Sequence, residues 1–414
     1  MFSIAKRGIP VAAALFLAGC ATGPTQYQAR ALSPAQQDVV ADKPADLQPL
    51  YRALFEEGRR NEVLNLMEIG AAAYRQGHYD LAKASLDQAI TEIESVYADN
   101  DAAHRARSLW YEEGEKDFKG EPYERSMVFF YRGLLFLRDG DYSNARASFL
   151  SGLLQDAFAE EDQHTTDFAS LIFLAGWSAK LAGSDTLAEQ HFQEYRQFRP
   201  NGPVPDADHN TLVIAETGSA PRKLADGVGH HQLVYRRGKH IRAQHAELVG
   251  GVNNDGQSLA LFPVEDLFFQ ASTRGGRTVD RIIEGKVQFK QNTETTGDVL
   301  TAASDSSALA GFSAAAGGGL AAGFHTITAI GVAAQGLSAR TRTRADTRYW
   351  HRLPDGLHVH TLHTTPQHTA LQVRFLDSAQ QPLPNLTHSV PVHFDSRGNG
   401  VAYASARPTE GTSP

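Results

Sequence analysis

The sequence predicts an α+β protein in which an N-terminal all-α domain of helical repeats is followed by a mixed α+β domain. Three observations lead to this class. Small and aromatic residues recur at the same intervals at three places between residues 61 and 200, as paired helices require. The stretch 201–223 is rich in proline and glycine, which is typical of a boundary. Beyond it, short alternating stretches with one helical pattern indicate mainly strands.

The helical repeats share a set of offsets. In each unit a glycine lies where two paired helices need a small side chain, and a second glycine seven residues later marks the turn between them. A residue two positions past the turn, aromatic in two units, and an alanine three positions further continue the second helix. The positions are Gly70, Gly77, Tyr79 and Ala82; Gly133, Gly140, Tyr142 and Ala145; and Gly176, Gly183, Asp185 and Ala188.

On these offsets the segment resembles the tetratricopeptide repeat (TPR) family over about 61–200, although the starts at 70, 133 and 176 are less regular than that family's period of about 34 residues. Helix pairs of this kind stack, because one pair cannot bury its apolar face alone. The resemblance implies that the first helices line a concave groove that binds a partner; the alternative is that the groove packs against the C-terminal half of the same chain. The expected groove residues are Ala71, Tyr74, Arg75, Leu134, Leu137, Arg138, Trp177, Lys180 and Leu181.

Residues 1–19 have the composition of a secretory signal peptide, with a basic pair at 6–7 and then an apolar run of about ten residues. Such a run is too short to span a bilayer. The signal ends in LAGC at 17–20, which resembles a bacterial lipobox. That resemblance implies cleavage before Cys20, acylation of its thiol by a chain such as palmitate, and a lipid anchor. Ala21 after the cysteine favours the outer membrane, with the protein facing the periplasm.

The rest of the chain divides by composition into further units. The expected units are a lipidated flexible tether over 20–48, helical repeats over 49–200, a linker over 201–223 with one short strand, an α+β domain over 224–406, and a disordered tail over 407–414. Strands are expected at 212–216, 232–236, 258–262, 357–363, 370–376 and 390–394, and a helix at 277–291.

Composition limits what the protein can bind or catalyse. Two of the 39 Lys and Arg lie in the signal, which leaves 37 against 47 Asp and Glu, or about −10 for the mature chain. This balance argues against nucleic acid as a partner. Cys20 is the only cysteine, so neither a disulfide nor a thiolate metal site is expected. The motifs G-x-S-x-G and H-E-x-x-H and the phosphate loop are absent, so we expect no enzyme and no cofactor.

Three stretches in the C-terminal half carry a wider resemblance: 271–277 (ASTRGGR), 285–298 (GKVQFKQNTETTGD) and 344–354 (RADTRYWHRLP). They are similar to a family of TPR-bearing envelope lipoproteins of Gram-negative bacteria, and the likeness covers most of the mature chain. These motifs have no assigned chemistry. Members often occur beside lipoproteins that activate cell-wall synthases, which implies, by analogy, a scaffold or adaptor for cell-wall or outer-membrane assembly that binds an envelope protein or peptide.

The segment 306–339 contains no Asp, Glu, Lys or Arg and is crowded with glycine and alanine. Gly319 and Gly323 are spaced for close helix contact. Apolar residues also recur there at helical intervals, which favours a buried pair of helices. The alternative is a segment that enters the membrane or lines an oligomeric pore, and this is the second function that the sequence allows.

Two further clusters of side chains have weaker functional signals. His358 and His360 share one face of an expected strand, which is metal-ligand spacing, but no carboxylate lies within the histidine-rich run 358–368. We therefore expect an exposed strand face and no metal site. Arg340, Arg342 and Arg344 also alternate and suit a lipid phosphate or a cell-wall carboxylate. A solvated face paired with acidic residues is the favoured alternative.

Overall fold

The structure is a computed structural model that describes residues 29–94, 117–157, 167–226, 232–250, 258–272 and 346–408. Several sequence predictions lie outside these residues. They are the lipidated Cys20, the helix expected over 277–291, the glycine-rich segment 306–339, and Arg340, Arg342 and Arg344. In the described parts of the chain, none of the helices has the length and apolar character that crossing a bilayer requires.

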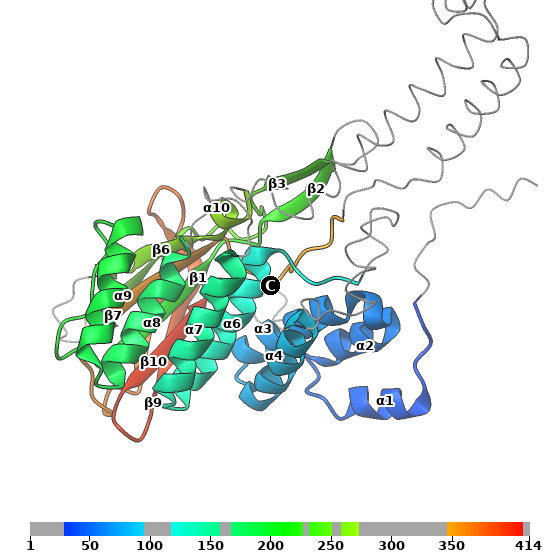
Figure 1. The fold of residues 1–414 in the computed structure, drawn as a ribbon, viewed down its shortest axis with the longest axis horizontal. Coiled ribbons are helices and arrows are strands. Elements are labelled where there is room, and N and C mark those ends of the chain that lie inside the picture. Colours follow the sequence, from blue (N-terminus) through cyan, green and yellow to red (C-terminus); the bar gives the residue numbers. More distant parts are fainter. Residues whose placement is uncertain are drawn as a thin grey trace, which may run out of the picture.

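Eight α-helices and one 3₁₀ helix lie in the described residues up to Phe198 (Figure 1). They are α1 (Pro34–Ala41), α2 (Gln48–Glu57), η1 (Gly58–Asn61), α3 (Glu62–Arg75), α4 (Tyr79–Glu94), α6 (Pro122–Arg138), α7 (Tyr142–Ala157), α8 (Ala169–Leu181) and α9 (Asp185–Phe198). The pairs α3/α4, α6/α7 and α8/α9 are hairpins that stand side by side.

Each hairpin is closed by a glycine in its first helix that lies against a large side chain of its second helix. A methyl group on that glycine would overlap the neighbour, so only glycine allows the two helices to approach this closely. The pairs, with the distance from such a methyl carbon to the neighbouring side chain, are Gly70 and Leu86 (2.7 Å), Gly133 and Phe149 (2.3 Å), and Gly176 and Phe192 (2.8 Å). The turn glycines are Gly77, Gly140 and Gly183, with φ of 79°, 72° and 75°, the left-handed conformation that ends helices.

The C-terminal half forms an eight-stranded sheet in the order β5-β4-β8-β9-β10-β1-β7-β6, while β2 and β3 pair separately. Neighbouring strands are antiparallel except β1 and β10, which are parallel. The strands are β1 (Thr211–Thr217), β2 (Arg222–Asp226), β3 (Gln232–Arg236), β4 (His245–Val249), β5 (Leu259–Ala260), β6 (Phe262–Asp266), β7 (Gly356–Leu362), β8 (Ala370–Leu376), β9 (Pro382–Phe394) and β10 (Gly400–Ser405). The short helix α10 (Leu267–Ser272) follows β6.

The sheet curls into a near-barrel. Its two edge strands, β5 and β6, are consecutive in the chain and are separated only by Leu261, whose backbone N–H donates to the Ala246 carbonyl of β4 at 2.9 Å. One stretch of chain therefore pairs with β4 at one edge and with β7 at the other. Val213, Val373 and Phe375 belong to a core cluster formed by strand and loop residues of this half, and it fills the interior of the near-barrel.

The helices and the sheet share a second, larger core. Leu212 and Ile214 of β1 belong to this core, whereas Val213 and Ala215 belong to the barrel interior, as alternation along a strand requires. All seven residues of β1 are buried, and β1 lies between β10 and β7. The stretch 201–223 therefore is not a linker between domains, because it contributes a fully buried strand that is paired on both sides.

The predicted fold class is wrong in its arrangement. The class is α+β, but the expected TPR-like repeat domain followed by a separate mixed domain does not describe the molecule. Eight helices of the described N-terminal region share one continuous core with a near-barrel sheet, and nothing in the packing shows the helices to be TPR-like. The recurrent offsets indicate helical hairpins, because a hairpin is a local structure. They do not indicate how the hairpins pack against one another or against the sheet.

Two expected unstructured regions contain ordered residues. Helix α1 lies within the predicted tether 20–48, and it begins with a capping box in which Ser33 and Gln36 bond reciprocally to each other's backbone N–H groups, at 2.9 and 3.3 Å. Arg407, placed in the predicted tail, donates through Nη2 to the carbonyl oxygens of His351 and Leu353 at 2.9 and 3.3 Å.

Candidate functional site

The surface expected to form an open groove is covered by the chain's own sheet and loops. Five of the nine expected groove residues are apolar and buried. Tyr74 packs edge-on against Tyr403 of β10, with ring centroids 4.8 Å apart. Leu181 is partly buried against the same core. The intramolecular packing considered above as an alternative is the arrangement observed. The five buried residues are Ala71, Tyr74, Leu134, Leu137 and Trp177.

The three cationic residues of the expected groove also contact the same chain. Arg75 pairs with Glu216 of β1 at 2.7 Å. Arg138 lies 3.8 Å from the Tyr79 ring centroid, with Nη2 3.5 Å from Nδ1 of His393. Lys180 donates to two carbonyl oxygens in the stretch before β1, at 2.6 and 3.0 Å. These residues hold the helices on the sheet, so they do not form a free docking surface.

The centre of this contact is a buried ion pair. Arg75 reaches Glu216 through both Nε and Nη2, at 2.8 and 2.7 Å, and the two side chains are 8% and 2% exposed. Tyr131 of α6 donates to the same carboxylate, and Arg75 donates to the Tyr131 hydroxyl at 2.7 Å. Burial is the main cause that raises the pKa of Tyr131 well above its usual value. A carboxylate held by this many donors fixes the position of α3 and α6 on β1.

A pocket of about 340 Å³ opens beside this ion pair, between helix α3, strands β9 and β10 and the end of the described chain. Three arginines line it, and none of the described residues that line it is Asp or Glu. Its residues are Ala72, Arg75, Gln76, Arg352, Asn385, Leu386, His388, Ser389, Val390, Pro391, Tyr403, Ala404, Ser405, Arg407 and Pro408. The described lining residues thus supply cationic donors and no carboxylate, and the nearby Glu216 and Glu68 lie behind Arg75 and Arg352.

The three arginines differ in how their charges are balanced. Arg75 has Glu216 as its counterion, and Arg352 pairs with Glu68 at 3.0 Å. Among the described residues, Arg407 has no carboxylate within ion-pair distance, and its guanidinium contacts only backbone carbonyls. Burial lowers the pKa of Arg407, and repulsion from Arg75 adds to this effect. Among the described residues, three guanidinium groups face two carboxylates at the pocket, which leaves about one positive charge uncompensated.

Several buried polar atoms around the pocket have no hydrogen-bond partner among the described residues. Buried polar groups are usually paired, so an unpaired group needs an explanation such as a bound ligand or water. These atoms are Nη1 of Arg75, Oε1 of Gln76 and Nε2 of His388. The pocket therefore combines uncompensated charge with unused hydrogen-bonding capacity, and it is the best candidate site in the described part of the chain.

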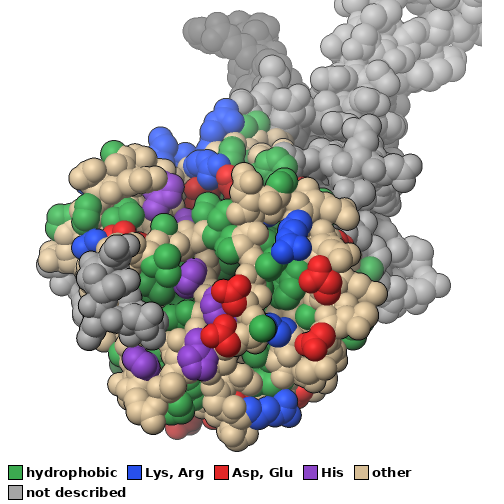
Figure 2. All heavy atoms as spheres, turned by 90° about the vertical axis from the view of Figure 1, so that its left-hand side faces the viewer, with side chains coloured by type: hydrophobic (Ala, Val, Ile, Leu, Met, Phe, Trp, Pro, Cys, Tyr) green, Lys and Arg blue, Asp and Glu red, His purple; other side chains and the backbone are tan. Residues whose placement is uncertain are grey.

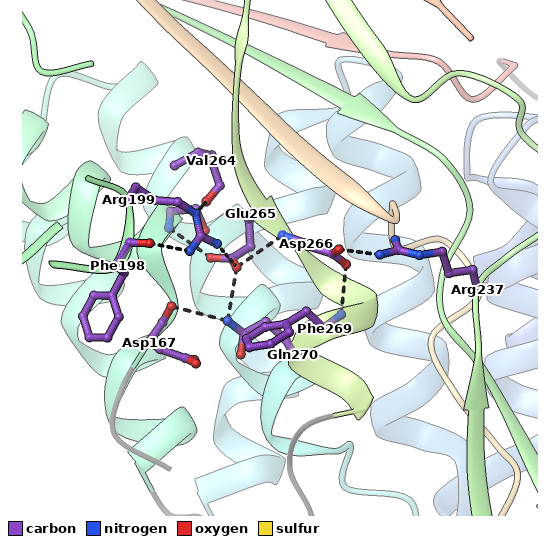
Figure 3. A network of polar contacts seen from close by, with 10 residues as sticks. Asp167, Phe198, Arg199, Arg237, Val264, Glu265, Asp266, Phe269 and Gln270 are labelled. Atoms are coloured by element: carbon purple, nitrogen blue, oxygen red, sulfur yellow. Dashed lines mark hydrogen bonds and ion pairs between the residues drawn. The ribbon is translucent and has the colours of Figure 1, made fainter. Parts of the chain in front are cut away.

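A second buried carboxylate, Glu265 of β6, joins the last hairpin to the sheet (Figure 3). It accepts hydrogen bonds from the backbone N–H of Ser170 at 3.1 Å, from Arg199 at 3.3 Å and from Gln270 at 3.1 Å. Nearby, Asp266 accepts from Arg237 at 2.5 Å. Both carboxylate oxygens of Glu265 accept hydrogen bonds. The residue does not line the arginine pocket, so we assign it a structural role.

Burial raises the pKa of Glu265 to about 7. A carboxyl group with a pKa raised by folding stabilises the native state below its unfolded value of about 4.5, and that contribution is lost as the pH rises to about 7. As the pH rises from 5 to 8, we expect the free energy of unfolding of Glu265→Gln to increase relative to that of wild type by roughly 3 kcal/mol. The measurement is urea unfolding of both proteins at each pH.

Comparing the two proteins at each pH cancels the titration of other groups, such as His358, whose pKa is lowered to about 4 by burial. Glu189→Gln is the matched control, because its side chain is 57% exposed and solvent screens its charge. A Glu265→Gln difference that stays constant across the pH range, like that of the control, would contradict the assignment.

The histidine cluster does not form the exposed strand face that the sequence suggested. His358 of β7 is only 2% exposed, and its ring lies 6.2 Å from that of His245. Figure 2 shows histidines close together on the face at the left of Figure 1, with acidic and basic side chains interspersed. No group of three or more His, Cys, Asp or Glu in the described ranges is placed to hold a metal ion.

Comparison of the chain with protein-family models, with curated proteins and with solved structures found no match. The pocket was not predicted from the sequence. Arg75 was predicted to contact a partner, but Arg352 and Arg407 lie 277 and 332 positions further along the chain, and they meet Arg75 only because β1 lies between β10 and β7. The missed signal was an arginine two residues after the β-prone stretch 400–405, and this arginine was interpreted as the start of a tail.

Proposed function

We propose that the protein is a non-enzymatic scaffold lipoprotein of the bacterial envelope, anchored to the outer membrane through lipid on Cys20 and facing the periplasm. It binds another envelope protein at the arginine-lined pocket between α3, β9 and β10. The observation that carries the proposal is Arg407, a partly buried guanidinium with no carboxylate partner in the described chain, on the wall of a pocket without acidic residues. The signal-like N-terminus and the LAGC sequence support the location.

This proposal moves the docking site from the centre of the helical surface to its edge. The central residues hold the molecule together, so changing them would unfold the protein before it revealed a binding role. The pocket is open on one side, where Ser389, Pro391 and Pro408 are exposed. A partner with an acidic segment would supply the missing counterion for Arg407, and arginine holds carboxylates by forked hydrogen bonds.

The test is crosslinking in intact cells followed by co-purification of the protein. We expect Arg407→Gln to lose the partners that wild type captures. Arg397→Gln is the matched control, because Arg397 is an exposed arginine on the neighbouring β9–β10 turn and does not line the pocket. Urea unfolding of each variant establishes that both remain folded. Capture of the same partners by folded Arg407→Gln would remove the pocket from the proposal.

A further inference from the structure

Strands β9 and β10 separate at the pocket. Their ladder includes Gly400–Phe394, Val401–His393 and Ala402–Val392, and it ends there. Strand β10 continues beside β1 as far as Ser405, so over its last three residues no strand of the described chain pairs with its other side. Pro391, the next residue of β9 in this register, has no N–H with which to continue the ladder.

The two separated stretches form facing walls of the pocket. Ser389, Val390 and Pro391 of β9 lie on one wall, and residues 403–405 of β10 lie on the other. Backbone groups on the free side of a strand bind an extended segment in the way that a neighbouring strand would. The pocket therefore combines main-chain donors and acceptors of residues 403–405 with the guanidinium groups of three arginines.

Positive charge is concentrated at the end of the pocket that lies beyond β10. Arg407 is two residues beyond the last residue of β10, and Arg352 and Arg75 line the same pocket. A carboxylate there would meet a guanidinium that has no acidic partner in the described chain. A phosphate would match this charge equally well, but a free phosphate would leave the strand side and the apolar wall residues Leu386 and Val390 unused.

We infer that the pocket takes an extended peptide of an envelope partner, which lies along the free side of β10 with a carboxylate, most simply its C-terminal one, at Arg407. This inference rests on the proposed scaffold function and names the chemistry of its ligand. It requires a short segment only, because the unpaired part of β10 is three residues long.

The probe is the tetrapeptide acetyl-Val-Thr-Val-Thr with a free C-terminal carboxylate, and its control is the same peptide with a C-terminal amide. Binding is followed by the backbone amide NMR shifts of residues 403–405 during titration to about millimolar concentrations. We expect the carboxylate form to shift these resonances. The amide form should bind at least roughly tenfold more weakly, because it lacks the charge-assisted hydrogen bond. Arg407→Gln should abolish the difference between the two forms, while Arg397→Gln should retain it.

The same titration is repeated with the chain lacking residues 409–414, because Pro408 lines the pocket and Glu410 follows it in the sequence. Equal affinity for the acid and the amide, or no shift in either chain, would overturn the inference. Shifts with inorganic phosphate but not with peptide would assign the pocket to phosphate ligands and also overturn it. If peptides fail but Arg407-dependent capture of partners persists, the scaffold proposal stands without this ligand.

Discussion

Glu216→Ala is expected to lower the free energy of unfolding by about 3–5 kcal/mol, because removing one partner of a buried ion pair leaves the other charge buried and uncompensated. Arg75 is 8% exposed and would lose both of its bonds to the carboxylate. Tyr131 would lose its acceptor as well. Chemical denaturation with linear extrapolation measures the loss.

The matched control is Glu189→Ala, which removes a carboxylate whose side chain is 57% exposed and 3.9 Å from Arg196. Exposed pairs contribute about 0–1 kcal/mol, so this variant should unfold close to wild type. Replacing the whole buried pair, by Arg75→Met with Glu216→Leu, should recover most of the loss, since apolar pairs of similar volume are often as stable. A cost below 1 kcal/mol for Glu216→Ala alone would mean that the ion pair does not hold the helices on the sheet.

The hairpins were predictable because their signals are local. Gly133 and Phe149 are sixteen residues apart on two helices joined by one short turn, so helix geometry and that turn fix their contact. The strand at β1 was also visible as an apolar run, but its place between β10 and β7 was not, because strand order depends on pairings between residues about 140 to 190 positions apart. The closure of the sheet was also not predictable, because it requires β6 to pair with β7, which lies about 95 positions further along the chain.

The same difference explains why the candidate site was only partly predicted. Arg75 was singled out from its position on a first helix, and the structure places it at the pocket, but with an internal counterion. Whether a side chain faces solvent or its own sheet depends on what the second half of the chain covers. Sequence spacing alone contains no information on that point. To predict Arg407 as a site residue, one would have to know where β10 ends and which helix lies beside it.

Trp177→Ala is expected to cost about 3–5 kcal/mol, as large-to-small changes in a packed core do. Trp177 is fully buried, and it belongs to the core that joins helices and sheet. This variant should therefore lose partners by unfolding. Loss of binding without loss of stability would instead restore a surface role for the side chain. Thermal and urea unfolding distinguish the two outcomes.

Two variants calibrate this expectation. Trp177→Phe keeps most of the volume and removes an indole N–H that has no partner among the described residues, so it should cost much less than alanine. Leu187→Ala on α9 removes an apolar side chain that is 38% exposed, and it should change stability by less than about 1 kcal/mol. If Trp177→Ala and Leu187→Ala cost the same, the helical layer would not be packed on the sheet as the structure describes. Partner capture should then be tested first at Trp177, because its side chain would lie open to a ligand.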